Sequence, residues 1–232
     1  MGQKVNPHGF RVGITEDWSS RWYAPKAAYS EFLIEDNKIR DYVDKRMNRQ
    51  PPYAAVARVE IERTRDEVKV ILHTARPGLV IGPKGAEVDK LKEALEDLVD
   101  RKISVNIIEI KNADLDAQLI AESIADQLKK RGSFRRVLKQ RCEAAMAAGA
   151  KGIKIKVSGR LGGAEMARKE TQIRGSIPLH TLQAHVDYGF AQSFTTYGAI
   201  GIKVWLYLGR YGEEVEAVQD PGRRRDRRMK RA

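Results

Sequence analysis

The chain has 232 residues, of which 43 are Lys or Arg and 31 are Asp or Glu, so its formal net charge is +12. Such an excess repels itself unless a polyanion relieves it, which predicts nucleic acid or an anionic membrane surface as the partner. No stretch approaches the ~18 consecutive apolar residues of a membrane-spanning helix, and the first residues lack the apolar core of a secretory signal. The single cysteine, Cys142, excludes an internal disulfide. Together these features predict a cytoplasmic protein.

The first part of the chain predicts a helix followed by two strands. Apolar residues recur near helical period over residues 27–47, and a Pro-Pro pair ends the pattern. Residues 57–62 and 68–73 then alternate between apolar and polar side chains. This alternation predicts a β-hairpin with a turn near residues 64–66.

A glycine loop, a helix and a third strand come next. The loop, Gly82-Pro83-Lys84-Gly85, follows a short apolar run at residues 79–81. The third strand is predicted over residues 102–111. The helix between them begins near Ala86 and is predicted to bury one apolar stripe. The members of that stripe are Val88, Leu91, Leu95, Leu98 and Val99.

A second unit is predicted from residue 112. It begins with a helix over residues 115–128 that Gly132 closes, and Ser133 is the predicted N-cap of the next helix. The predicted inner face of that second helix consists of Phe134, Val137, Leu138, Cys142 and Met146. Strands are predicted over residues 153–158, 165–177, 182–190 and 200–208. Helices followed by a run of strands favour a separate α+β domain with one antiparallel sheet.

We therefore expect an α+β protein of two domains with a flexible basic tail. The predicted ranges are 1–16 for an N-terminal extension, 17–111 for the first domain with its core at about 39–109, 112–211 for the second domain and 212–232 for the tail. The tail carries seven basic residues after Pro221 and a single acid, Asp226. Such a composition cannot build a packed core.

The glycine loop is the feature that indicates a function. Gly82 and Gly85 lack side chains and let a backbone pass close to a sugar–phosphate chain, while the following helix directs its free N–H groups to the same place. Lys84 adds a mobile charge, whereas Pro83 contributes no N–H. The loop resembles the GxxG loop with which a KH domain clamps a short single strand of RNA. It does not match the GxxxxGK[ST] pattern of a nucleotide-binding P-loop.

Basic residues gather in a second place. Seven lie between residues 129 and 141 with no acid among them: Lys129, Lys130, Arg131, Arg135, Arg136, Lys139 and Arg141. Solvated faces usually mix the signs of charge, so this run favours a phosphate-binding face. The turn at residues 159–163, between two predicted strands, carries Arg160, which we expect to be exposed to a phosphate.

Other candidate sites have simpler interpretations. His180 and His185 have no cysteine nearby and do not fit a zinc spacing, so no metal and no cofactor are expected. Cys142 lies on an apolar stripe and is predicted to be a buried hydrophobe. Trp18, Trp22 and Tyr23 are suited to stacking on bases or, at least as well, to covering the core.

Eight segments spread over the chain resemble one family, the bacterial-type third protein of the small ribosomal subunit. They are residues 1–7 (MGQKVNP), 73–78 (HTARPG), 80–85 (VIGPKG), 115–117 (LDA), 150–154 (AKGIK), 158–165 (SGRLGGAE), 178–182 (PLHTL) and 195–198 (TTYG). The resemblance implies a type II KH domain followed by the C-terminal domain of that family, on the head of the small subunit.

The resemblance also implies partners and sites. The partners are small-subunit ribosomal RNA, messenger RNA and the tenth and fourteenth proteins of the subunit, with the fourth and fifth proteins near the place where messenger RNA enters. The RNA-binding residues implied are Gly82, Pro83, Lys84, Gly85, Arg76 and Arg160. The residues that the resemblance implies to line the messenger channel and to help open messenger structure are Arg135, Arg136 and Lys139. Lys130 and Arg131, from the same basic run, are predicted to join them, and these five residues are hereafter the basic cluster.

Two alternatives stay open at this point. One is a free regulatory KH protein that binds single-stranded messages, which the loop favours and the later segments do not. The other is an enzyme, either a nuclease or a lyase with a lysine nucleophile. The sequence shows no paired carboxylates at metal-binding spacing, and the expectation is therefore a non-enzymatic protein of the ribosome.

Overall fold

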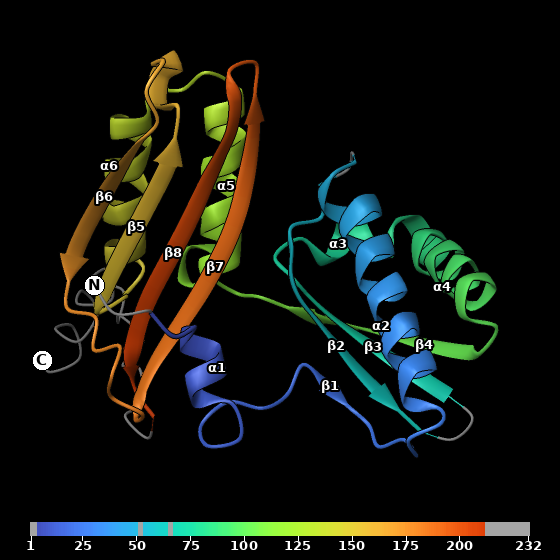
Figure 1. The fold of residues 1–232 in the computed structure, drawn as a ribbon. Coiled ribbons are helices and arrows are strands. Elements are labelled where there is room, and N and C mark those ends of the chain that lie inside the picture. The colour runs from blue at the N-terminus through green and yellow to red at the C-terminus, as the bar shows by residue number, and fades with distance from the viewer. Residues whose placement is uncertain (1–3, 51–52, 65–66, 212–232) are drawn as a thin grey trace, which may run out of the picture.

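The computed structural model describes residues 4–50, 53–64 and 67–211, and it shows two units, each with a four-stranded sheet (Figure 1). The strand order is β1-β2-β3-β4 in the first sheet and β6-β5-β8-β7 in the second. In each unit two long helices cover one face of the sheet (Figure 1). This confirms the α+β class, while the tail predicted at residues 212–232 lies outside the described residues.

The first unit has the element order of a type II KH domain. Its elements are α2 (Tyr29–Val43) with a π-helical turn (Asp44–Asn48), β2 (Val56–Arg63), β3 (Glu67–Thr74), α3 (Pro77–Ile81), α4 (Ala86–Val99) and β4 (Lys102–Glu109). Strands β2 and β3 pair antiparallel, and β3 and β4 pair parallel. A two-residue strand, β1 (Ser20–Arg21), pairs parallel with β2 at the edge of the sheet, and the sequence pattern did not predict it.

The core of the first unit lies between its sheet and the helices α2 and α4. Ile39 and Val43 of α2 and Leu91 and Leu95 of α4 are buried with strand residues such as Leu72. Leu98 was predicted on the same stripe, but its side chain is 41% exposed. At 100° per residue Leu98 lies at the border of the stripe, and its neighbour Val99 is buried instead.

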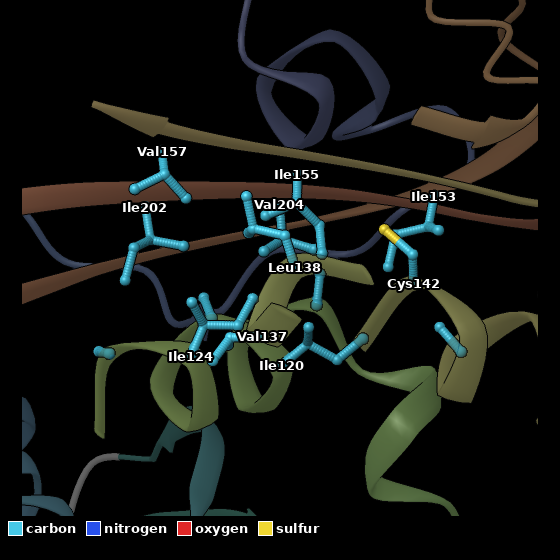
Figure 2. Packing of buried hydrophobic residues seen from close by; sticks show 14 of the residues in the cluster. Ile120, Ile124, Val137, Leu138, Cys142, Ile153, Ile155, Val157, Ile202 and Val204 are labelled. Atoms are coloured by element: carbon cyan, nitrogen blue, oxygen red, sulfur yellow. The ribbon is translucent and has the colours of Figure 1, made fainter. Parts of the chain in front are cut away.

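The second unit packs two helices on one face of an antiparallel sheet. Its elements are α5 (Ala117–Lys129), α6 (Phe134–Ala147), β5 (Gly152–Gly159), β6 (Arg168–Gly175), β7 (Ala184–Thr195) and β8 (Gly198–Arg210). Figure 2 shows Ile120 and Ile124 of α5 and Leu138 of α6 facing the strand residues Ile155 and Val204. Cys142 is buried there as predicted, whereas Met146 is 37% exposed and Ala145 takes the inner position instead.

The ends of α5 show how the sequence sets helix boundaries. Asp116 caps the first turn by accepting hydrogen bonds from the N–H groups of Gln118 and Leu119. At the other end Gly132 was predicted to close the helix, and the left-handed residue there is Arg131, with φ of 60°. Gly132 donates to the carbonyl of Gln127, and a Cβ on Gly132 would lie 2.9 Å from that oxygen. Glycine is therefore required for space, one residue after the left-handed position.

The N-terminal segment docks on the second unit. Helix α1 (Pro7–Arg11) lies beside the end of β7 at which that strand begins (Figure 1). The fully buried guanidinium of Arg11 donates hydrogen bonds to five backbone carbonyls, among them Ala184 at 2.7 Å and Thr181 at 3.0 Å. A small apolar cluster containing Val186 and Tyr207 lies at this end of β7 and β8.

Candidate nucleic-acid interface

The glycine loop connects α3 to α4 through a single tight turn (Pro83–Gly85). Gly82 adopts φ 67° and ψ −178°, a region open essentially to glycine alone. A Cβ on Gly82 would lie 2.6 Å from Cγ of Glu87, so the backbone also needs the missing side chain for space. Gly85 has φ 85° with open space around it. Both glycines therefore provide a backbone conformation that other residues avoid, and Gly82 also allows the loop to pack closely on α4.

Pro83 and Lys84 form the exposed tip of the loop. Lys84 is left-handed, with φ 56° and ψ 21°, which costs a non-glycine residue roughly 1–2 kcal/mol. Lys84 lies two residues before the first residue of α4. Strain of this kind is found at functional sites, where the surrounding structure maintains it.

Two charged side chains that the sequence analysis did not single out lie beside the loop. The carboxylate of Glu87 is 2.9 Å from Nζ of Lys90 and 3.5 Å from Nη2 of Arg46. The hydrogen bond from Lys90, and then that from Arg46, hold the pKa of Glu87 below its usual value. A carboxylate therefore lies in the first turn of α4, and Arg46 adds a positive charge from the π-helical turn that follows α2. Arg46 was missed because it approaches the loop through tertiary structure only.

Arg76 lies at the start of α3, and its side chain is exposed apart from a 3.4 Å hydrogen bond to the carbonyl of Tyr53. Next to it, Leu79 and Ile81 are about two-fifths exposed, while Val80 between them is buried. The loop therefore combines exposed cations with exposed apolar side chains. That combination suits a strand of RNA, whose phosphates and bases need different contacts.

The basic cluster is brought together by the turn between α5 and α6. Lys130 and Arg131 follow the end of α5, and Arg135, Arg136 and Lys139 lie on the exposed side of α6. The side chains of Arg135 and Lys139 are 75% and 65% exposed. Their i, i+4 spacing places them on one side of the helix, as expected.

The basic run was interpreted as free of acids. This is true of the sequence between residues 129 and 141, but it is wrong in the folded structure, where two acids approach the cluster. Glu170 of β6 lies 3.7 Å from Nη2 of Arg135, and Glu143 lies 4.0 Å from Nζ of Lys139. Strand β6 also brings a cation that was not anticipated, because Arg168 and Arg135 both lie over the ring of Phe134. Both acids are partly or fully exposed, so these ion pairs are weak and leave the cluster available.

Arg160 has a bracing role within the second unit. It donates to the carbonyls of Ala164 at 2.9 Å and Tyr197 at 3.3 Å, and its guanidinium lies over the Tyr197 ring. It therefore ties the β5–β6 turn to the β7–β8 hairpin. Arg160 is half-buried and so less open than the sequence analysis expected. A phosphate contact from its remaining edge stays a prediction.

Three other candidate residues, His185, Cys142 and Trp22, occupy structural positions, whereas Trp18 and Tyr23 are 64% and 93% exposed. The centres of the His185 and Tyr211 rings are 4.8 Å apart, and burial lowers the pKa of His185. His180 is exposed. Burial raises the pKa of Cys142 to about 11, so the thiol stays protonated at neutral pH. Trp22 packs on Phe32 and donates to Asp36, which shows that it covers the core.

Residues 4–50, 53–64 and 67–211 hold no group of three or more His, Cys, Asp or Glu side chains arranged to bind a metal ion. None of the helices in these ranges combines the length and the apolar character needed to cross a bilayer.

The fold and the loop define the class: a KH-domain protein that carries a second α+β domain. Residues 38–115 match the KH domain family, and residues 124–206 match the family described as ribosomal protein S3, C-terminal domain. The chain belongs to the uS3 family of small ribosomal subunit proteins, which is a structural family and not a family of enzymes.

Curated relatives support this assignment over nearly the whole chain. The chain is 54% identical to the small ribosomal subunit protein uS3 of Rhodopirellula baltica over 215 residues, which cover 92% of this chain and 91% of the relative. It is 52% identical to uS3 of Desulforudis audaxviator over 223 residues, covering 96% and 100% of the two chains. For uS3 of Listeria monocytogenes the identity is 54% over 209 residues, covering 90% and 94%.

Proposed function

We propose that this chain is a structural constituent of the small ribosomal subunit that binds small-subunit ribosomal RNA, and that its basic cluster holds messenger RNA where the message enters. The names of the relatives, which are all small ribosomal subunit proteins, support the first part. The exposed arrangement of Arg135, Arg136 and Lys139 on α6 is the observation that carries the second part. No base readout and no chemical step are assigned to these residues.

The proposed mechanism is electrostatic. Each Arg or Lys that neutralises a phosphate releases counterions, which favours binding without regard to sequence. A positive face at the entrance holds a separated strand and so biases fraying base pairs toward the open state. Since the cluster needs no nucleotide hydrolysis for this, we expect unwinding to depend on its charge alone.

Further partners follow from the family resemblance. We propose contacts with the tenth and fourteenth proteins of the subunit, and a position near the fourth and fifth proteins at the messenger entrance. The ribosome of the cytoplasm is the proposed location. The loop at Gly82–Gly85, with Arg76 beside it, is the proposed contact of the KH domain with RNA.

The test is a triple variant, Arg135→Ala, Arg136→Ala and Lys139→Ala, in reconstituted ribosomes. Translation through a stable messenger hairpin should slow, while translation of unstructured messages should hardly change. For RNA binding by the chain, the slope of log affinity against log salt should flatten by up to ~2, because each single-strand phosphate contact contributes about 0.7. A matched control removes three exposed lysines of the first unit, Lys26, Lys38 and Lys102. Equal slowing on both kinds of message would refute the unwinding role.

A further inference from the structure

The sheet of the second unit has a face that neither of its described long helices, α5 and α6, covers. Helices α5 and α6 pack on the other face, against residues such as Ile155 and Val204. Because side chains alternate between the two faces of a strand, the neighbouring positions point away from the helices. These positions are Lys154 and Lys156 of β5, Lys203 and Trp205 of β8, and Tyr188 and Phe190 of β7.

The strand register arranges these side chains in rows across the sheet. In one row Lys154, Trp205 and Tyr188 are paired neighbours, and in the next row Lys156, Lys203 and Phe190 are paired neighbours. A third row continues with Lys169, Ser158, Gly201 and Gln192. We call the first two rows, with Lys169, the aromatic–lysine face.

The N-terminal segment covers only one end of this side of the sheet. The apolar cluster with Val186 and Tyr207 lies at that end, and the ring of His8 meets the edge of the Tyr188 ring there. Beyond it, Phe190 is 42% exposed and Phe194, further along β7, is 67% exposed. Among the described residues, the N-terminal segment therefore covers one end of this side, and the rings of Phe190 and Phe194 lie exposed beyond it.

The charge on the open half has one sign. The rows contain four lysines and no acid, and the acids of these strands that the structure describes point to the helix side. Asp187 there accepts a hydrogen bond from the N–H of Ala117 in α5, and Glu170 pairs with Arg135 of α6. Charge complementarity therefore calls for a polyanion.

The rings identify which polyanion fits. Nζ of Lys154 lies 5.2 Å from the centre of the Trp205 ring, Nζ of Lys203 lies 6.0 Å from the centre of the Phe190 ring, and the Tyr188 and Trp205 rings are 5.5 Å apart. Flat rings on a sheet are platforms on which unpaired bases stack, and lysines beside them meet the phosphates. A duplex has its bases already stacked and offers only phosphates.

We propose that the aromatic–lysine face is a further RNA-binding site, which takes single-stranded RNA by stacking bases on Trp205 and Phe190 and binding phosphates through Lys156, Lys169 and Lys203. Lys154 leaves the Trp205 ring when a base occupies it and pairs with the adjoining phosphate. The site is separate from the glycine loop and from the basic cluster. It recognises the single-stranded state and not a base sequence.

The experiment uses the full chain with Pro83→Asp and Lys84→Asp, so that the loop contributes little. Two fluorescent probes of equal length are compared by anisotropy: oligouridine and the same backbone without bases. Phe190→Leu should weaken binding of oligouridine about fivefold or more, because stacking of a base on an aromatic ring is lost. The baseless probe should bind unchanged, and Phe190→Tyr should retain the affinity for oligouridine. Tyr29→Leu, which removes a ring that is 52% exposed on the first unit, is the matched control.

A second pair of changes tests the lysines. Lys156→Gln with Lys203→Gln should lower the salt slope for oligouridine by about 1.4, at about 0.7 for each contact. The proposal fails if Phe190→Leu binds oligouridine as the parent does, or if it loses both probes equally. It also fails if an oligoglutamate peptide competes as well as oligouridine, since the face would then take an acidic protein segment. The triple variant of the basic cluster should keep the difference between the two probes, so failure of one proposal is distinguishable from failure of the other.

Discussion

Nε of Arg11 donates a 2.7 Å hydrogen bond to the carbonyl of Ala184, which joins residues 173 positions apart. The guanidinium is fully buried and its other hydrogen bonds also go to backbone carbonyls. A planar group with five donors in fixed directions suits such a set of acceptors, and an ammonium group does not. The N-terminal segment is therefore built into the second unit.

Arg11→Lys should lower the free energy of unfolding by roughly 3 kcal/mol, because buried carbonyls lose charge-assisted hydrogen bonds. Urea denaturation followed by circular dichroism measures this change. Arg210→Lys, at an exposed position on β8, is the control and should change stability little. Equal stability of the two variants would show that the buried guanidinium of Arg11 makes no specific contribution to the free energy of unfolding.

The same docking makes stability depend on pH through His8. Its ring lies 2.7 Å from Glu16 and 3.3 Å from Asp187. The hydrogen bond with Asp187, helped by Glu16 and opposed by burial, raises the pKa of His8 from 6.5 to about 9. The folded state thus binds this proton more tightly than the unfolded state. The stabilisation is fully present below pH about 6.5 and is lost as the pH rises to about 9.

Between pH about 6.5 and about 9 we expect the free energy of unfolding to fall by on the order of 2 kcal/mol, after allowing for solvent screening of a partly exposed ring. His8→Gln should flatten the dependence of unfolding free energy on pH between these limits. His180→Gln, at an exposed histidine, should leave it as in the parent. If the unfolding free energies of the parent and of His8→Gln depended on pH in the same way, His8 would not be the group that causes the pH dependence.

The two loop glycines allow a paired test. Gly82→Ala should cost about 1–3 kcal/mol of stability and weaken RNA binding, since its backbone conformation excludes alanine and the new Cβ meets Glu87. Gly85→Ala should cost only its left-handed strain, roughly 1–2 kcal/mol, because the space around it is open. Thermal melting and RNA binding are measured on both. A larger effect at Gly85 than at Gly82 would count against the packing of Gly82 on α4.

Charge at the loop tip is tested by Pro83→Asp with Lys84→Asp. Aspartate tolerates the left-handed conformation of Lys84, so the melting temperature should barely change. Binding of single-stranded RNA at low salt should weaken strongly, because two negative charges then face the phosphates. The chain offers a matched control in Pro25→Asp with Lys26→Asp, an exposed Pro-Lys pair away from the loop. Similar losses from both pairs would show general repulsion only.

The helices and strands were predictable where local pattern decides them. Apolar period located α4, α5 and α6, and alternation located β5 and β8. Contacts between distant segments were not predictable, since no local pattern encodes the approach of Glu170 to Arg135 or of Arg11 to Ala184. Gly132 was predicted to close α5, but the sequence did not show that Arg131 adopts the left-handed conformation before it.

The same distinction between local pattern and distant contacts applies to the candidate RNA-binding sites. The glycine loop and the basic cluster are contiguous in sequence, so composition and spacing were enough to find them. Arg46 beside the loop and Arg168 beside the cluster come from other elements and needed the structure. The aromatic–lysine face is assembled from four strands, and only their register reveals it.

Sedimentation tests most directly whether this chain is built into the small ribosomal subunit. The tagged chain is expressed in bacterial cells, and the ribosomal subunits are separated on gradients at high salt, where purely electrostatic contacts with RNA are released. The account predicts that the chain stays with the small subunit in about equal amount to that subunit's other proteins. Recovery of the chain at the top of the gradient, free of subunits, would contradict the account and favour a free RNA-binding regulator.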